Sequence, residues 1–473
     1  MVLHSAMELF CLNIHLQQGE QWKKHMDIFN ELKTKPMNSY RWLLVALCIL
    51  LNVVDGYDVQ VMSFTAASVS KEWALSGSEL GILISLGLIG MAVGSLFIAP
   101  IADSVGRRTI ILSCLLLSGI TMLVSSHADS AFQLGTLRFI TGIGIGGLLT
   151  NGAVMANEFS TTKWKNLSVA LLSTGYAMGA VFGGMIAFRL IGTVGWRTVF
   201  LCGGLFTLAV LVLVYFVLPE SVEYQLIKRK PNTLERINKT LAKFKISTIE
   251  AFPAYQQVST GKVTIASLFK GQLKVRTLFV WVAFFSVMAG QYFILTWTPK
   301  LLSMAGMTPE QGVSLGIILN FGGIFGAILM AFLTVRFKIH FVLSIFFAAT
   351  AACITVFVLN SGDYTNAMWI AVLVGVFNNG CVAGMYALAN STYDTEVRAT
   401  GVGSAITMGR LGGILSPLGA GYLLDAGVKP LHLYNFDAVL FGVGCVMIVL
   451  MYIAVRKQNL GKTVAQTQQH TTP

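Results

Sequence analysis

Residues 42–63 read WLLVALCILLNVVDGYDVQVMS. This segment is long enough to cross a hydrocarbon core of about 30 Å as an α-helix, for which about 20 apolar residues are needed. Asp55 and Asp58 nevertheless lie within it, three residues apart and on one side of the predicted helix. With Trp42 at the membrane edge, the two carboxyl groups lie roughly 20 and 24 Å deep. A charge at that depth costs at least ~2.5 kcal/mol, so the pair indicates a functional role inside a membrane.

The composition of the whole chain also indicates a membrane protein. Of its 473 residues, 55% are hydrophobic and 11% are charged, whereas a soluble domain carries about a quarter charged residues. We predict an all-α integral membrane protein with twelve transmembrane helices in two pseudo-symmetric six-helix bundles. The predicted spans are 42–63, 79–100, 108–126, 132–156, 167–188, 197–218, 276–298, 312–334, 340–359, 366–388, 399–424 and 435–455.

These spans divide the chain into five parts. They are an N-terminal tail (1–41), an N-terminal bundle (42–218), a central loop (219–274), a C-terminal bundle (275–455) and a C-terminal tail (456–473). Most of the 33 Lys and Arg residues fall in the two tails, the central loop and other loops on the same side. Positive loops face the cytoplasm, so both termini are predicted to be cytoplasmic. The same bias accounts for the net charge of +12 without a nucleic-acid partner.

The two halves show a faint internal repeat. Residues 138–142 (RFITG) in the fourth span align with residues 376–380 (VFNNG) in the tenth. Two six-helix repeats with a polar site between them are typical of transporters that work by alternating access. We therefore expect a substrate site at the interface between the halves.

Arg138 is the predicted partner of the acidic pair. It enters its span from the outer side and lies at nearly the depth of Asp55 and Asp58. A guanidinium group matches the geometry of a carboxylate, whether the carboxylate belongs to the protein or to a substrate. One hypothesis is that protonation of an Asp frees Arg138 for a substrate anion. A permanent salt bridge that only holds the helices together is an equally good interpretation.

Further polar and aromatic side chains lie in the second half of the predicted bundle. Amide and aromatic groups together form a suitable clamp for a planar ring, although Trp and Tyr near helix ends are also common at the membrane interface. This second interpretation fits Trp297 well. The candidate substrate-binding residues are Arg138, Asn378, Asn379, Tyr57, Tyr386 and Arg410, with Gln291 and Tyr292 nearby in the seventh span.

Charged loops at the predicted cytoplasmic side are candidates for a gate. One lies between the second and third spans and one just before the eleventh. Positive-inside charges explain the arginines but not the acids beside them, so we predict that these loops interlock when the inner side is closed. The candidate gating residues are Asp103, Arg107, Arg108, Glu158 and Arg398.

No enzyme motif with coherent spacing occurs in the chain. It has no Walker A sequence, no HExxH and no glycine-flanked serine. The seven cysteines show no CxxC or metal-ligand spacing. We predict a protein that is not an enzyme, is not driven by ATP, and uses no metal and no cofactor.

Three motifs resemble those of the major facilitator superfamily: Asp103-x-x-Gly106-Arg107-Arg108, the glycine-rich run that follows Arg138, and Pro219-Glu220-Ser221. Within that superfamily, the tetrapeptide Asp55-Gly56-Tyr57-Asp58 is similar to the aromatic acid:proton symporters of the benzoate and 4-hydroxybenzoate type. Residues 396–401 and 409–412 are also similar to that family. The resemblance extends over about residues 38–456.

This resemblance implies proton-coupled uptake of an aromatic carboxylate, such as benzoate or a hydroxybenzoate, across a bacterial inner membrane. It assigns proton coupling to Asp55 and Asp58 and carries roles in transport to the matching charged residues Arg138, Glu158, Asp103, Arg398 and Arg410. The expected partners are a small organic anion, protons and the lipid bilayer, with a monomer as the functional unit. The alternatives are transport of another small anion, export by proton antiport on the same fold, and a non-transporting sensor of aromatic acids.

Overall fold

The computed structural model describes residues 31–228, 233–249, 252, 265–269, 271, 273–394 and 397–470, and all regular structure in these ranges is helical. Eleven of the described helices are long and apolar enough to cross a membrane. The remaining predicted span, 399–424, corresponds to α15 (Arg398–Asp425), a helix of 28 residues that is richer in glycine and polar residues. The prediction of an all-α membrane fold is therefore confirmed.

The N-terminal bundle begins three residues earlier than predicted, at Ser39, because the side chain of Asn38 accepts a hydrogen bond from the backbone N–H of Arg41 and caps the helix. The second span extends past Pro100 through short π, 3₁₀ and α turns. The helices of this bundle are α2 (Ser39–Glu72), α3 (Gly77–Val93), η1 (Gly94–Ile98), η2 (Ala99–Ile101), α4 (Ala102–Val105), α5 (Arg107–Ser125), α6 (Ala131–Phe159), α7 (Lys165–Leu190) and α8 (Trp196–Val217).

The described part of the central loop contains short helices rather than only irregular chain. These are α9 (Val222–Lys228), α10 (Thr233–Lys243) and η3 (Ile265–Phe269). The C-terminal bundle then consists of α11 (Leu273–Met304), α12 (Pro309–Arg336), α13 (Ile339–Leu359), α14 (Tyr364–Thr392), α15, η4 (Pro430–His432) and α16 (Leu433–His470).

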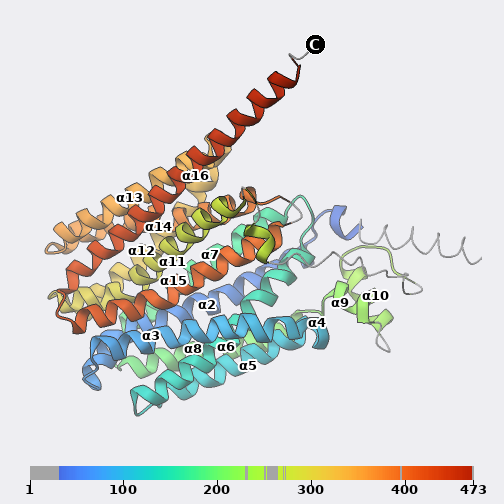
Figure 1. The fold of residues 1–473 in the computed structure, drawn as a ribbon. Helices are drawn as coiled ribbons and strands as arrows, with labels where there is room; N and C mark the ends of the chain where they lie inside the picture. The colour runs from blue at the N-terminus through green and yellow to red at the C-terminus, as the bar shows by residue number, and fades with distance from the viewer. Residues whose placement is uncertain are drawn as a thin grey trace, which may run out of the picture.

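The long helices run roughly parallel and antiparallel to one another, and α9 and α10 lie beyond one end of the bundle (Figure 1). We call this end the loop end. The opposite end, where α2 finishes at Glu72 and α15 at Asp425, is the far end. Between the two bundles, α3 packs against α15, α7 against α12 and α2 against α11.

Glycine allows α2 and α7 to pack closely beside the acidic pair. A Cβ atom at Gly56 would lie 1.9 Å from the backbone oxygen of Tyr176. No side chain fits there, so the backbone of α2 lies directly against α7. This contact fixes the direction in which Asp55, the preceding residue, points.

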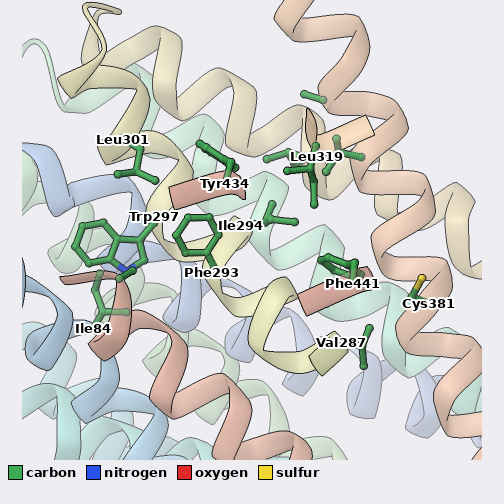
Figure 2. Packing of buried hydrophobic residues seen from close by; sticks show 14 of the residues in the cluster. Ile84, Val287, Phe293, Ile294, Trp297, Leu301, Leu319, Cys381, Tyr434 and Phe441 are labelled. Atoms are coloured by element: carbon green, nitrogen blue, oxygen red, sulfur yellow. The ribbon is translucent and has the colours of Figure 1, made fainter. Parts of the chain in front are cut away.

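The hydrophobic core is continuous between the two bundles only toward the far end. There, one cluster joins residues of α2 and α3, such as Phe64 and Ile84, with Trp297 and Ile294 of α11; Figure 2 shows Ile84 beside Trp297. The loop-end half of the N-terminal bundle forms a separate cluster. Trp297 is fully buried, so the interpretation of this residue as an interfacial tryptophan is wrong.

Candidate functional site

A polar cavity of about 270 Å³ lies between the two bundles, near the middle of the long helices. Its walls come from α2, α3, α6 and α7 on one side and from α11, α14 and α15 on the other. Both halves therefore contribute to it, as expected for a site at the interface of two repeats. Its polar lining residues are Asn52, Asp55, Ser173, Tyr176, Gln291, Tyr292, Asn379, Tyr386 and Arg410.

Asp55 and Arg410 are the charged side chains that line this cavity. Asp55 lies on α2, is 5% exposed, and within the described part of the chain its Oδ1 has no hydrogen-bond partner. Arg410 lies on α15, contacts the Ser95 hydroxyl with its Nη1, and attracts the Asp55 carboxylate electrostatically. A carboxylate from one half thus faces a guanidinium group from the other, with room for a small ligand at the same cavity.

Asp58 and Arg138 form a separate, buried ion pair. The Arg138 guanidinium group donates to both Asp58 carboxylate oxygens, at 2.5 and 2.9 Å, and to the Asp58 backbone oxygen at 2.9 Å. The two residues are 2% and 3% exposed, and neither lines the cavity. In this conformation Arg138 is therefore fully engaged by Asp58, and the arginine that faces the cavity is Arg410.

We expect this pair to stabilise the N-terminal bundle. Asp58→Asn leaves a buried guanidinium group without its counter-charge, which costs about 3–5 kcal/mol, so the thermal unfolding midpoint of the purified protein should fall markedly. A double change to apolar residues, Asp58→Leu with Arg138→Met, should recover most of that loss. Fluorescence-monitored unfolding in detergent measures both effects, and an unchanged midpoint for Asp58→Asn contradicts the assignment.

The rest of the cavity lining combines aromatic rings with amide groups. Tyr176 and Tyr292 come from opposite halves, and Tyr386 packs edge-on against Phe284. The Asn379 amide donates 2.7 Å to the backbone oxygen of Gly323, which holds its side chain in place. Rings and amides at the walls, with one arginine, make a suitable site for a flat molecule that carries a carboxylate and polar substituents.

Besides Arg138, two further predicted binding residues lie outside the cavity. Tyr57 is 1% exposed, donates 2.7 Å to the backbone oxygen of Val199, and contacts other rings of the N-terminal bundle. Asn378 is 4% exposed and is likewise absent from the cavity lining. The structure thus places Asn379, Tyr386 and Arg410 at the cavity and separates Tyr57 and Asn378 from it.

The candidate gating residues of the N-terminal bundle form a cluster at the loop end. Arg107 forms an ion pair with Glu158 and lies 3.7 Å from Asp103. Ser221 donates to Glu158 at 2.5 Å, and the backbone N–H of Arg108 donates to Glu220 at 2.9 Å. The cluster therefore joins α5, α6 and the start of the central loop within a single half.

The second predicted gating segment makes its described contacts within the C-terminal half. The Arg398 Nε donates 3.2 Å to the backbone oxygen of Tyr393, while Thr395 and Glu396 lie outside the described residues. Among described residues, no ion pair joins this segment to Asp103 or Arg107. The interlocking of the two loops stays a prediction for a conformation in which the loop end is closed.

Three cavity residues were missed by the sequence interpretation: Asn52, Ser173 and Tyr176. Asn52 precedes Asp55 by three residues, so helical spacing could have placed it on the same side of α2. Ser173 and Tyr176 share a similar spacing on α7, but no charge in that span singles them out. Their position becomes evident only from the close packing of α2 and α7.

Comparison with known proteins identifies the fold. The family model described as Major Facilitator Superfamily matches residues 48–417. The chain belongs to the major facilitator superfamily. The chain is also similar in fold to the solved inward-open structure of the xylose transporter XylE from E. coli. The two superpose with a TM-score of 0.67 at 16% identity, and the match covers 87% of this chain and 95% of that one.

Relatives of this superfamily member are transporters of aromatic acids. The 4-hydroxybenzoate transporter PcaK of Pseudomonas aeruginosa is 30% identical over 421 residues, covering 88% of this chain and 92% of the relative. The gallate transporter of Pseudomonas putida is 30% identical over 405 residues, covering 85% of this chain and 90% of the relative. The chain is thus a multi-pass membrane transporter of the superfamily, related to carriers of aromatic acids.

Proposed function

We propose that the protein imports an aromatic carboxylate, such as a hydroxybenzoate or benzoate, together with protons by alternating access. The observation that carries the proposal is the cavity in which Arg410 of one half faces Asp55 of the other. An arginine in a cavity between membrane-spanning helices favours binding of an anion, and a buried carboxyl group at the same cavity is suited to carry a proton.

The cavity supports the aromatic part of the proposal as well. In it, Arg410 binds the substrate carboxylate, Tyr176 and Tyr292 enclose the ring, and Gln291 and Asn379 are placed to bind ring substituents. The related transporters of 4-hydroxybenzoate and gallate carry ligands with these features. At about 270 Å³ the cavity is just smaller than the pockets of about 300–1,000 Å³ that hold drug-sized ligands, which suits a ligand as small as a single-ring acid.

The substrate carboxylate and Asp55 compete for Arg410, and this competition couples substrate binding to proton binding. Arg410 and Asp55 line the same cavity, so without substrate the guanidinium group attracts the Asp55 carboxylate and opposes the effects of its burial and of the nearby Asp58. A substrate carboxylate at Arg410 neutralises that attraction, so the buried Asp55 is then more stable with a proton. The mechanism resembles the one predicted from the sequence, with Arg410 in the role that was expected for Arg138.

The contacts between the bundles support an inward-facing conformation, with the loop end in the cytoplasm of a bacterial inner membrane and both termini on that side. At the far end, Asp425 of α15 accepts hydrogen bonds from the backbone N–H groups of Gly77 and Ser78, at 2.7 and 2.8 Å. These are the first residues of α3, in the other half. A carboxylate at a helix N-terminus is stabilising there, so this contact closes the far end.

Asp425→Asn is therefore expected to open the far end. The variant loses the charge that caps α3 across the interface. Ser85 is a suitable position for a reporter cysteine, because it is buried between the halves and donates to the backbone oxygen of Ile414. With Ser85→Cys present, Asp425→Asn should make this cysteine react several-fold faster with an impermeant maleimide added outside. The matched control is Asp363→Asn, because Asp363 caps its own helix at the same end. Equal labelling of the two variants contradicts a gate at Asp425.

Uptake by purified protein in liposomes tests the proposed function. An imposed pH gradient, acidic outside, should drive accumulation of radiolabelled 4-hydroxybenzoate or benzoate, and a protonophore should abolish it. If neither acid accumulates, the proposal is wrong. If the acids leave loaded vesicles in exchange for protons entering, the alternative of an exporter by proton antiport is correct.

A further inference from the structure

A second cavity, of about 200 Å³, lies at the side of the C-terminal bundle between α11, α15 and α16, and Leu415 and Phe436 in its wall are half-exposed. We call it the side cavity. Its walls are apolar, including Phe285, Phe293 and Phe436, with Ser416 and Asp437 as its polar lining residues. It is separated from the substrate cavity by α11 and α15, which line both cavities with different residues.

Asp437 is a buried acid that the proposed transport mechanism does not use. It lies on α16, is 2% exposed, and neither carboxylate oxygen has a hydrogen-bond partner among the residues that the structure describes. An isolated carboxylate in such surroundings is far less stable than the neutral acid. A carboxyl group in this position is therefore suited to bind a proton.

The ionisable groups on the helices packed around the side cavity have other positions or partners. Arg410 and Tyr292 line the substrate cavity, Asp425 caps α3, and Lys300 donates to Ser70. Tyr434 donates to Thr298. Lys274, Arg276, His340 and Arg398 lie near the loop end of their helices, and Tyr422, Lys429 and His432 are exposed at the far end. Asp437 is thus suited to bind a proton and has no fixed counter-charge lining its cavity.

The position of Asp437 couples it to the wall of the substrate cavity. A Cβ atom at Gly290 would lie 2.8 Å from its Oδ1, so the carboxyl group lies against the α11 backbone. The next two residues of α11, Gln291 and Tyr292, line the substrate cavity. Figure 2 shows the neighbouring rings of Phe293, Tyr434 and Phe441. A movement of α11 during transport therefore changes the surroundings of Asp437 directly.

Asp437 is also close to the far end of the bundle. It follows Leu433, the first residue of α16, by four residues, which places it about 6 Å along the helix from that end. A proton from the far side therefore has a short path to this carboxyl group. The corresponding path from the loop end is several times longer.

We propose that Asp437 is a second proton-binding site, which loads from the far side and releases its proton when α11 moves. The proposal rests on the proposed function, in which Asp55 carries the first proton. Two protons moving with one monovalent carboxylate carry a net charge of +1 into the cell. Transport is then electrogenic, whereas one proton with one carboxylate is electroneutral.

Liposomes with an imposed membrane potential and no pH gradient test this proposal. Moving one charge through a potential of 100 mV corresponds to about 2.3 kcal/mol. With one net charge moved per substrate, such a potential, negative inside, should therefore raise the accumulation ratio of the wild-type protein about 50-fold. Asp437→Asn keeps the shape of the side chain but binds no proton, so its accumulation should not respond to the potential. It should still respond to a pH gradient, because Asp55 is intact.

Ser416→Ala is the matched control, since it changes the other polar residue of the side cavity without removing a titratable group; it should retain the response to potential. Electroneutral transport by the wild type, or a full response to potential in Asp437→Asn, overturns the proposal. An Asp437→Asn protein with an unfolding midpoint far below the wild type and no transport in either gradient indicates a structural role and also overturns it. If the wild type itself takes up no aromatic acid in either gradient, the proposed function fails instead.

Discussion

Arg410→Ala is expected to lower kcat/KM for aromatic carboxylate uptake by about 10²–10³-fold. Two charge-assisted hydrogen bonds from a guanidinium group to a carboxylate contribute roughly 3–4 kcal/mol in a buried site, and each 1.36 kcal/mol corresponds to a factor of ten. Arg410 is the cationic side chain that lines the substrate cavity, so no neighbour there replaces it. Arg410→Lys keeps the charge but loses the paired donors of the guanidinium group, so its kcat/KM should lie between those of the wild type and Arg410→Ala.

Initial rates of uptake over a range of substrate concentrations measure this effect. The matched control is Arg336→Ala, because Arg336 is an exposed arginine at the loop end of α12 and should leave transport unchanged. An Arg410→Ala variant with a normal KM and normal rate shows that the substrate carboxylate binds elsewhere, and Arg138 then becomes the next candidate.

Asp55→Asn is expected to abolish accumulation while preserving exchange. The amide resembles the protonated acid in shape and charge, so the loaded protein can still change conformation, but it releases no proton on the cytoplasmic side. Concentrative uptake under a pH gradient should fall to the level of empty liposomes. Exchange of external labelled substrate for internal unlabelled substrate should continue.

Both activities are measured in the same liposomes with the same substrate. Asp129→Asn is the matched control, since Asp129 is an exposed acid in the loop between α5 and α6 and lies outside the substrate cavity. Accumulation against a gradient by Asp55→Asn shows that another group carries the coupled proton. Loss of both accumulation and exchange shows that Asp55 is needed for binding or folding rather than for coupling.

The sequence is sufficient to predict the fold because its main signals are local. Apolar runs of spanning length and the bias of Lys and Arg between loops each follow from the energetics of a bilayer. Helix boundaries were less accurate, since they depend on caps such as Asn38 and on contacts that extend α2 to Glu72. The short helices of the central loop carry no comparable signal.

The partners of the two acids could not be predicted from spacing. Depth along a helix places Asp55, Asp58 and Arg138 at a similar level, but it does not say which way each side chain points. Three residues correspond to about 300° of rotation, so the two acids differ by roughly 60° in direction. The close approach of α2 to α7 at Gly56 resolves this difference, with Asp58 toward Arg138 and Asp55 toward the cavity.

Asp437 was not singled out by the sequence interpretation, although an acid inside a predicted span is itself a signal of function. It lies inside the predicted span 435–455 without a second charge or a motif near it. Its significance depends on the absence of a hydrogen-bond partner and on its contact with the α11 backbone, both of which are properties of tertiary packing. Similar reasoning applies to Tyr176, whose role depends on the packing of α7 against α2.

Proton uptake on substrate binding tests the central claim, that a carboxylate at Arg410 causes Asp55 to take a proton. Purified protein in weakly buffered detergent solution is mixed with 4-hydroxybenzoate as its anion, and the pH change is compared with the amount bound. The wild type should take up close to one proton for each substrate bound, and Asp55→Asn should bind substrate with almost no uptake of protons. Equal proton uptake by the two proteins would contradict the account.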